Sequence, residues 1–511
     1  MSEETAISAH AALAGEHATH APDLGNYVGG AWVAVPGVEH LDVINPATAQ
    51  VIARVPLSGA LHVEAAVAAA RAALPQWRAT PVIRRAQLLF ELRRELRDRA
   101  EELAASVTRE MGKTIGDARA EVDRMIEMVE AATAIPQTMQ GRTLEGVARN
   151  VDCETIRQPV GVCAAITPFN FPAMVPMWFL PFAIGAGNTF ILKPSEQTPM
   201  TQAIVFEILD SLGLPPGVVN LVNGAHDVVN AILDSPGIDA VSFVGSANVA
   251  RYIYERAAAQ GKRVQALGGA KNHMVVMPDA VIEKTAENIL ASAFGAAGQR
   301  CMAGSVVVAV AGAWETLRPE LIARAAALRV GDGSDPGVDV GPVISPAACA
   351  RIEGEIEAAL AAGASLALDG RAPAAAGAGG GYLGPTIIEN VDPDSATIRE
   401  EIFGPVLSVV TVDTLDDAID LVNASRYGNG TSIFTESGAT VRRYRSDVQV
   451  GMIGVNIGVA APVAFFPFSG WKASFLGDIH AHGQDAIEFY TRKKTITTRW
   501  FSETSGRYFV E

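Results

Sequence analysis

Short apolar runs rich in β-branched residues alternate with helical segments along this chain, and this alternation constrains its fold more than any other feature. Four runs have the length and composition of buried strands: 162–166, 189–192, 218–222 and 240–244. Helical patterns such as 202–212 lie between them, and parallel strands need such crossover segments to return to one sheet. A second alternating series follows at 272–434. The pattern predicts an α/β fold with helices packed on parallel sheets.

Length and composition are those of a large globular protein. The 511 residues exceed what a single hydrophobic core spans, so we expect two or three domains. Hydrophobic residues make up 49% and charged residues 19%, which argues against a disordered chain. The net charge of -16 disfavours binding to a polyanion. The sequence therefore predicts no nucleic-acid partner.

The four cysteines, Cys153, Cys163, Cys301 and Cys349, are irregularly spaced. No two of them have the spacing of metal ligands, and a chain of this size does not need disulfides for stability. We therefore expect no metal site and a reducing, cytoplasmic setting.

Two segments could be mistaken for targeting or membrane sequences. The N-terminal 1–25 is rich in Ala and His but has no continuous apolar core, so we predict a mobile tail rather than a secretory signal. The uncharged stretch 169–192 is long enough to span a membrane, but its three prolines and two glycines disfavour a lipid-exposed helix. We predict a buried strand, turn and helix there, and no membrane partner.

Three further elements are expected outside the alternating series. Apolar residues at helical spacing predict one amphipathic surface helix: Leu89, Leu92, Leu96, Leu103 and Val107. A second helix is predicted at about 117–133. The C-terminal 489–500 has the composition of one long strand with few core-type residues, and such a strand pairs with another element or another subunit.

The segment FGAAGQRCM at 294–302 surrounds Cys301 with small residues and puts Arg300 beside it. A lone cysteine is usually an inert buried side chain. A nearby positive charge favours the thiolate, which is the nucleophilic form. The segment alone does not decide between these two interpretations.

Six short motifs occur in order along the chain: TPFNFP at 167–172, KPSE at 193–196, FVGS at 243–246, GG at 268–269, GQRC at 298–301 and EIFGP at 401–405. Together they give the chain, from about Asn26 to Trp500, a resemblance to the aldehyde dehydrogenase superfamily. The resemblance implies a Rossmann-type NAD-binding domain, an α/β catalytic domain and a small β oligomerisation extension.

The resemblance also implies domain boundaries and an assembly. The NAD-binding domain is expected at 26–143 with 158–270, the catalytic domain at 271–480, and the extension at 144–157 with 481–511. Through this extension the chain is expected to form a homo-oligomer, in which dimers pair into tetramers.

The resemblance assigns chemical roles to two residues. Cys301 is the nucleophile that adds to a small aldehyde, and Asn170 stabilises the resulting oxyanion together with the backbone N–H of the cysteine. Hydride transfer to NAD then leaves a thioester on Cys301. Without the cysteine, Asn170 would be an ordinary turn residue before a strand.

The expected NAD contacts come from several motifs. Gly245 and Ser246 join a strand to a helix, where backbone N–H groups bind a pyrophosphate; without a GxGxxG motif, this is by itself also an ordinary strand–helix turn. By resemblance, Lys193 and Glu196 bind the adenosine ribose, although alone they could be a solvated pair. The Glu196 carboxylate favours NAD over NADP. The other expected contacts are Phe169, Leu267, Glu401 on the nicotinamide ribose, and Phe403 beside it.

Hydrolytic members of the family have a water-activating glutamate where this chain has Leu267, or Ala266 if the glycines are aligned. Neither side chain accepts a proton, so the thioester needs another acceptor. Coenzyme A is suited to this, because its thiolate attacks without a strong protein base. The segments 264–273, 294–302 and 477–501 resemble the methylmalonate-semialdehyde dehydrogenase branch, which is CoA-acylating and makes propionyl-CoA or acetyl-CoA with CO2.

The branch binds the substrate carboxylate with two arginines, which match Arg124 and Arg300. Judged by its own neighbours, Arg124 is equally well explained as a solvated helix residue. Three departures from the branch leave a related aldehyde open as the substrate: Met125 in place of glycine, the loop 455–466, and the bulky Trp178 and Phe179.

Two other functions stay open on the sequence alone. A hydrolytic aldehyde dehydrogenase needs another carboxylate, and Asp478 is a candidate without a matching position in the family. A non-catalytic member would keep the fold as a structural or binding protein. Such a protein would not need the full set Asn170, Lys193, Glu196, Cys301 and Glu401.

Overall fold

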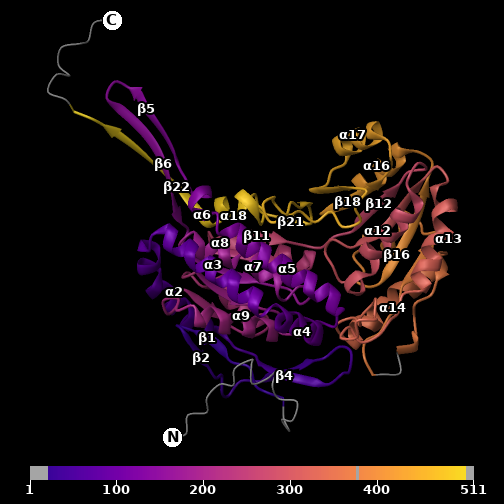
Figure 1. Ribbon diagram of the computed structural model, residues 1–511, viewed down its shortest axis with the longest axis horizontal. Coiled ribbons are helices and arrows are strands. Elements are labelled where there is room, and N and C mark those ends of the chain that lie inside the picture. Colours follow the sequence, from indigo (N-terminus) through magenta and orange to yellow (C-terminus); the bar gives the residue numbers. More distant parts are fainter. Residues whose placement is uncertain (1–20, 376–378, 502–511) are drawn as a thin grey trace, which may run out of the picture.

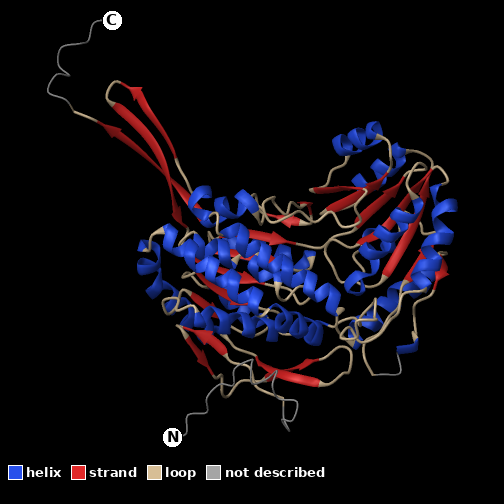
Figure 2. Ribbon diagram, in the orientation of Figure 1, coloured by secondary structure: helices blue, strands red, loops and turns tan. Residues whose placement is uncertain are grey.

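The computed structural model describes residues 21–375 and 379–501. Figure 1 shows two α/β units side by side and a sheet that projects from the first of them. The projecting sheet has three strands. In Figure 2 the strands of both units lie inside and helices cover them. The α/β fold expected from the alternating pattern is confirmed. Residues 1–20 of the predicted tail lie outside the described residues, whereas Leu24 packs in a small buried cluster with Val43.

The first sheet has eight strands in the order β2-β1-β9-β8-β7-β10-β11-β21. Its outer strands are β2 (Ala31–Val33), β1 (Asn26–Val28) and β21 (Phe475–Leu476). Its five central strands are parallel: β9 (Val219–Leu221), β8 (Thr189–Lys193), β7 (Val162–Ile166), β10 (Ala240–Val244) and β11 (Arg263–Leu267). All four strands expected here are present, and each bound agrees within one residue. The carboxyl ends of parallel strands meet at one edge, which is where such sheets bind ligands.

Both faces of this sheet are buried, which is why its strands are continuous apolar runs. Val162, Ala164 and Ile166 of β7 pack in one hydrophobic cluster. Cys163 and Ala165 between them pack in the cluster on the other face. The alternation follows from the two-residue period of a strand.

The second sheet has seven strands in the order β14-β15-β16-β13-β12-β18-β19. All are parallel to their neighbours except β14, and the strands are β14 (Ser365–Leu368), β15 (Thr386–Glu389), β16 (Val406–Val412), β13 (Gly304–Val310), β12 (Asn272–Val276), β18 (Gly430–Phe434) and β19 (Met452–Val455). The chain crosses from the first sheet to the second at 268–271. The GG motif therefore lies between the two units.

The predicted surface helix is two helices, α3 (Val82–Asp98) and α4 (Ala100–Met111). The chain leaves helical geometry at Arg99, with φ -105° and ψ 19°. Leu89, Leu92, Leu96, Leu103 and Val107 belong to one buried core cluster. The amphipathic pattern was a correct guide to burial, but the apolar spacing continues across the break and hides it. The next helix, α5 (Ile115–Ala132), matches the second predicted helix.

The C-terminal prediction of one strand at 489–500 is wrong at its start. Phe489 and Tyr490 end the helix α18 (Gly483–Tyr490), where both side chains are buried. The strand β22 (Thr491–Arg499) pairs antiparallel with β6 (Val151–Pro159), which also pairs with β5 (Arg142–Ala148). This sheet is the projecting one in Figure 1.

The uncharged stretch 169–192 folds into α7 (Met174–Met177), α8 (Leu180–Gly185) and most of β8. Among the described residues, no helix is long and apolar enough to cross a membrane.

Replacing Leu96 with alanine is expected to lower the free energy of unfolding by about 2–5 kcal/mol, because a cavity remains where its buried side chain packs. Urea denaturation followed by circular dichroism measures the change. The matched control is Phe90→Ala in the same helix, whose side chain is 56% exposed and whose loss costs within about 0.5 kcal/mol. Equal losses in the two variants would contradict the packing of α3.

Candidate active site

Cys301 lies in the turn between the short 3-10 helix η1 (Gly295–Gly298) and strand β13. Two cavities meet at this residue, one of about 590 Å³ and one of about 260 Å³. Cys301 and Phe171 line both of them. A thiol in this position can act on a small molecule in one cavity while a second molecule occupies the other.

The larger cavity lies at the carboxyl ends of β7, β8 and β10. It brings together Asn170 and seven of the eight residues predicted to bind the cofactor: Phe169, Lys193, Glu196, Gly245, Ser246, Glu401 and Phe403. Leu267 is the exception, because its side chain is buried at the end of β11 and its carbonyl accepts a hydrogen bond from the Gly245 N–H at 3.0 Å. The adjacent Gly268 lines the cavity instead.

One wall of the larger cavity carries an ion pair. The Lys193 ammonium donates to the Glu196 carboxylate at 2.8 Å. Burial by itself raises the pKa of Glu196, but the charge and hydrogen bond of Lys193 outweigh it, and the net pKa lies below its usual value. Glu196 is therefore ionised at neutral pH, and it can accept hydrogen bonds from hydroxyl groups.

Glu401 on the same cavity differs from Glu196. Burial raises the pKa of Glu401 to about 7, although the Ala270 N–H, which donates at 3.2 Å, and the charge of Lys271 act in the opposite direction. The Phe169 and Phe403 rings lie nearby in edge-to-face contact, with centroids 5.9 Å apart. The two aromatic rings can contact a flat ring of a ligand, and the Glu401 carboxyl group can bind hydroxyl groups next to that ring.

The Cys301 thiol is neutral in the ligand-free protein. Burial raises its pKa to about 12, and the charge of Glu401 adds to this. Arg300 lowers the pKa, in the direction that the sequence predicts, but does not offset burial. The Arg300 guanidinium donates to the Ser292 carbonyl at 3.1 Å and to the Ala291 carbonyl, near the end of α12 (Ile282–Phe294).

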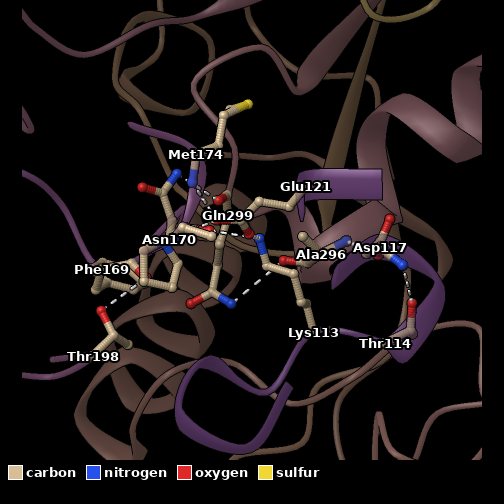
Figure 3. A network of polar contacts seen from close by, with 12 residues as sticks. Lys113, Thr114, Asp117, Glu121, Phe169, Asn170, Met174, Thr198, Ala296 and Gln299 are labelled. Carbon is tan, nitrogen blue, oxygen red and sulfur yellow. Dashed lines mark hydrogen bonds and ion pairs between the residues drawn. The ribbon is translucent and has the colours of Figure 1, made fainter. Parts of the chain in front are cut away.

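Four side chains hold the nucleophile and the predicted oxyanion donor. The Asn170 amide donates to the Gln299 carbonyl at 2.9 Å, two residues before the cysteine (Figure 3). The amides of Asn272 and Asn429 donate to the Cys301 carbonyl at 2.8 and 3.0 Å. The Lys113 ammonium donates to the Asn170 carbonyl at 2.7 Å.

Lys113, Asn272 and Asn429 were not predicted from the sequence. Asn272 follows the GG motif by three residues, directly after Lys271, so its place beside the cysteine could have been suspected from the motif. Lys113 and Asn429 are more than fifty residues from the segments that they hold and have no local signal.

The smaller cavity brings together both predicted substrate arginines, Arg124 and Arg300, with Cys301. Arg124 pairs with Glu127 at 2.7 Å and is half-exposed. Two of the departures from the branch line this cavity: Trp178, and the loop 455–466 through Val459, Ala461 and Pro462. Met125 and Phe179 are buried in the core instead.

The position that carries the base in hydrolytic enzymes holds no carboxylate here. Ala266 and Leu267 are both buried within β11. Asp478, the alternative base, is exposed and lines neither cavity. Among the described residues, no group of three His, Cys, Asp or Glu side chains could hold a metal ion.

A family model described as the aldehyde dehydrogenase family matches residues 32–496. The chain belongs to this family. It is 50% identical over 477 residues to malonate-semialdehyde dehydrogenase 1 of Geobacillus kaustophilus, covering 93% of this chain and 98% of the relative. It is 49% identical to malonate-semialdehyde dehydrogenase 2 of Bacillus anthracis, with coverage of 93% and 98%.

Solved structures agree with this assignment. The methylmalonate-semialdehyde dehydrogenase of Oceanimonas doudoroffii is 44% identical, with a TM-score of 0.92 and coverage of 94% of this chain and 99% of that chain. A Sinorhizobium meliloti 1021 protein, assigned as a methylmalonate-semialdehyde dehydrogenase and solved with NAD, is 42% identical, with a TM-score of 0.93 and coverage of 95% and 100%. The aldehyde dehydrogenase fold expected from the sequence is confirmed.

In the ligand-free protein, the rate at which iodoacetamide alkylates Cys301 is expected to rise about tenfold per pH unit from about pH 7 to about pH 9. The thiol pKa of about 12 lies above this range, so the thiolate fraction grows with pH throughout. Peptide mapping by mass spectrometry measures the rate at Cys301, and Cys301→Ser identifies alkylation elsewhere. A plateau below about pH 8 would contradict the neutral resting thiol.

Proposed function

We propose that this aldehyde dehydrogenase is a CoA-acylating, NAD-dependent enzyme that oxidises malonate or methylmalonate semialdehyde to acetyl-CoA or propionyl-CoA with release of CO2. The observation that carries the proposal is the position of Cys301, which lines both cavities while the residues at the position of the hydrolytic base are Ala266 and Leu267. The names of relatives about 50% identical over nearly the whole chain support this substrate class.

The larger cavity fits NAD by the chemistry of its donors. Backbone N–H groups at the start of α11 (Ala247–Ala259), next to Gly245 and Ser246, suit a pyrophosphate. The ionised Glu196 with Lys193 suits ribose hydroxyls and repels a 2′-phosphate, which favours NAD over NADP. Glu401 and Phe403 suit the nicotinamide ribose. NAD supplies the hydride acceptor when it is bound.

The protein residues carry the other steps of the oxidation. The Cys301 thiol first loses its proton to solvent water. The thiolate sulfur then forms a bond to the aldehyde carbon, and the carbonyl electron pair moves to the oxygen as an oxyanion. The Asn170 amide and the backbone N–H of Cys301 are proposed to stabilise this charge. When hydride leaves that carbon, the C–H bond breaks, the C=O bond re-forms, and a thioester remains on Cys301.

Release of the acyl group is proposed to use coenzyme A rather than water. Neither Ala266 nor Leu267 can take a proton from water, whereas a CoA thiolate attacks the thioester without such a base. The Cys301 thiolate then leaves. Coenzyme A is proposed to enter through the larger cavity, because the smaller one receives the aldehyde.

The substrate carboxylate is proposed to bind Arg300, with Arg124 at the half-exposed side of the smaller cavity. The Arg300 Nε is buried and has no hydrogen-bond partner, so it has a donor to offer. A carboxylate β to the thioester carbonyl can leave as CO2, because the thioester stabilises the resulting enolate.

Three broader assignments accompany this function. We assign NAD binding to 26–143 with 158–270, catalysis to 271–480, and oligomerisation to 144–157 with 481–511, where β5, β6 and β22 project from the body. This sheet is proposed to form dimers that pair into tetramers. A cytoplasmic setting stays a prediction from the cysteine pattern.

NADH formation and products should be measured with a panel of small aldehydes, including both semialdehydes, with and without CoA. We expect CoA to raise turnover of the semialdehydes at least about tenfold, since acyl transfer otherwise lacks a base, and to yield acyl-CoA and CO2. Cys301→Ser should abolish turnover, whereas Cys349→Ser should not. Turnover unchanged by CoA, with free acid as the product, would contradict the CoA-acylating assignment.

A further inference from the structure

The loop that carries Cys301 has an unusual backbone. Ala296 and Ala297 have φ of 49° and 52°, and Gly298 follows with φ of 70°. Left-handed conformations are strained for residues with a Cβ, and they persist where the surroundings enforce them. Two consecutive alanines in this region therefore require an anchor from outside the loop.

Asp117 provides such an anchor. Its carboxylate accepts a hydrogen bond from the Ala296 N–H at 2.9 Å (Figure 3). Asp117 stands in the first turn of α5, and its own N–H donates to the capping hydroxyl of Thr114 at 3.1 Å. The contact joins a helix of the first unit to the cysteine loop, 179 residues further along the chain.

One helical turn further along, Glu121 holds the other catalytic segment. It accepts hydrogen bonds from the N–H groups of Ala173 and Met174 at 2.8 and 3.1 Å. It also pairs at 2.6 Å with Lys113, which donates to the Asn170 carbonyl. Residues four apart share one face of a helix. The same face of α5 therefore holds both the Asn170 segment and the Cys301 segment.

We propose that Asp117 is a positioning residue for aldehyde oxidation. Its hydrogen bond to Ala296 fixes the position of the Cys301 loop relative to Asn170. The Asn170 segment is itself held by Glu121 of the same helix and by Lys113, which pairs with Glu121. This inference rests on the proposed roles of Cys301 and Asn170. Asp117 also lines the smaller cavity, where burial lowers the pKa of Arg300 and the Asp117 charge acts to raise it. Its positioning role comes from the hydrogen bond rather than from this charge.

Two substitutions separate the effect of the Asp117 hydrogen bond from the effect of its charge. Asp117→Ala removes the acceptor and is expected to lower kcat for the semialdehyde about 10- to 100-fold, because small misplacements of reacting groups have effects of that size. The KM for NAD is expected to stay within about twofold, since Asp117 does not line the larger cavity. Asp117→Asn keeps an acceptor without the charge and is expected to retain kcat within about threefold. Asp123→Asn, exposed on the same helix, is the matched control.

Hydrogen–deuterium exchange of the peptide 294–302, measured by mass spectrometry, gives a readout that needs no aldehyde. Exchange should be faster in Asp117→Ala than in the wild type, and unchanged in Asp117→Asn and Asp123→Asn. If Asp117→Ala does not fold, Asp117→Ser, whose hydroxyl is too short to reach Ala296, takes its place.

The inference is overturned if the variant without the acceptor keeps wild-type kcat and exchange, or if Asp117→Asn loses as much kcat as Asp117→Ala. A wild-type protein that does not oxidise the semialdehydes would instead contradict the proposed function, and the exchange experiment would still decide whether Asp117 holds the loop.

Discussion

The position of Cys301 between two cavities is the constraint on which the rest of the site depends. Its partly buried thiol is neutral at rest, since loss of solvation raises its pKa to about 12, so its position rather than its resting charge prepares it for reaction. The amides of Asn272 and Asn429 hold its backbone carbonyl, and α5 holds the loop before it. These contacts come from both α/β units, so the site exists only where the two units meet.

The charged groups around the cavities follow one pattern. Glu196 and Glu121 are each paired with a lysine, and Asp117 is bound to a backbone N–H. Burial raises the pKa of Glu401 to about 7, which reduces its negative charge at neutral pH. Arg300 and Arg124 line the smaller cavity, where they can meet an anionic substrate. The carboxylates that share this cavity are Glu121, which is paired with Lys113, and Asp117, which accepts from the Ala296 N–H.

The sequence predicts the sheet well because a strand buried on both faces is a continuous apolar run, as at β7 and β10. It predicts most of the site because the motif residues cluster at strand ends. It does not predict the helix break at Arg99, where charged residues lie on both sides, or the helical conformation of Phe489 and Tyr490, whose aromatic side chains are equally typical of a strand. The contacts of Asp117 and Lys113 join segments far apart in the chain, so no local pattern marks them. Leu267 was predicted to contact the cofactor, but its side chain is buried at the end of β11 and does not line the cavity. This burial depends on how β11 packs, which the motif does not show.

In the proposed reaction the acyl group passes through a thioester on Cys301. This thioester can be trapped by mixing the protein with NAD and malonate semialdehyde without CoA, quenching in acid, and mapping the peptides by mass spectrometry. We expect a malonyl or acetyl group on Cys301 that disappears when CoA is added before the quench, and no such group in Cys301→Ser. Formation of NADH with the Cys301 peptide unmodified, or with the acyl group on another residue, would contradict the proposed reaction.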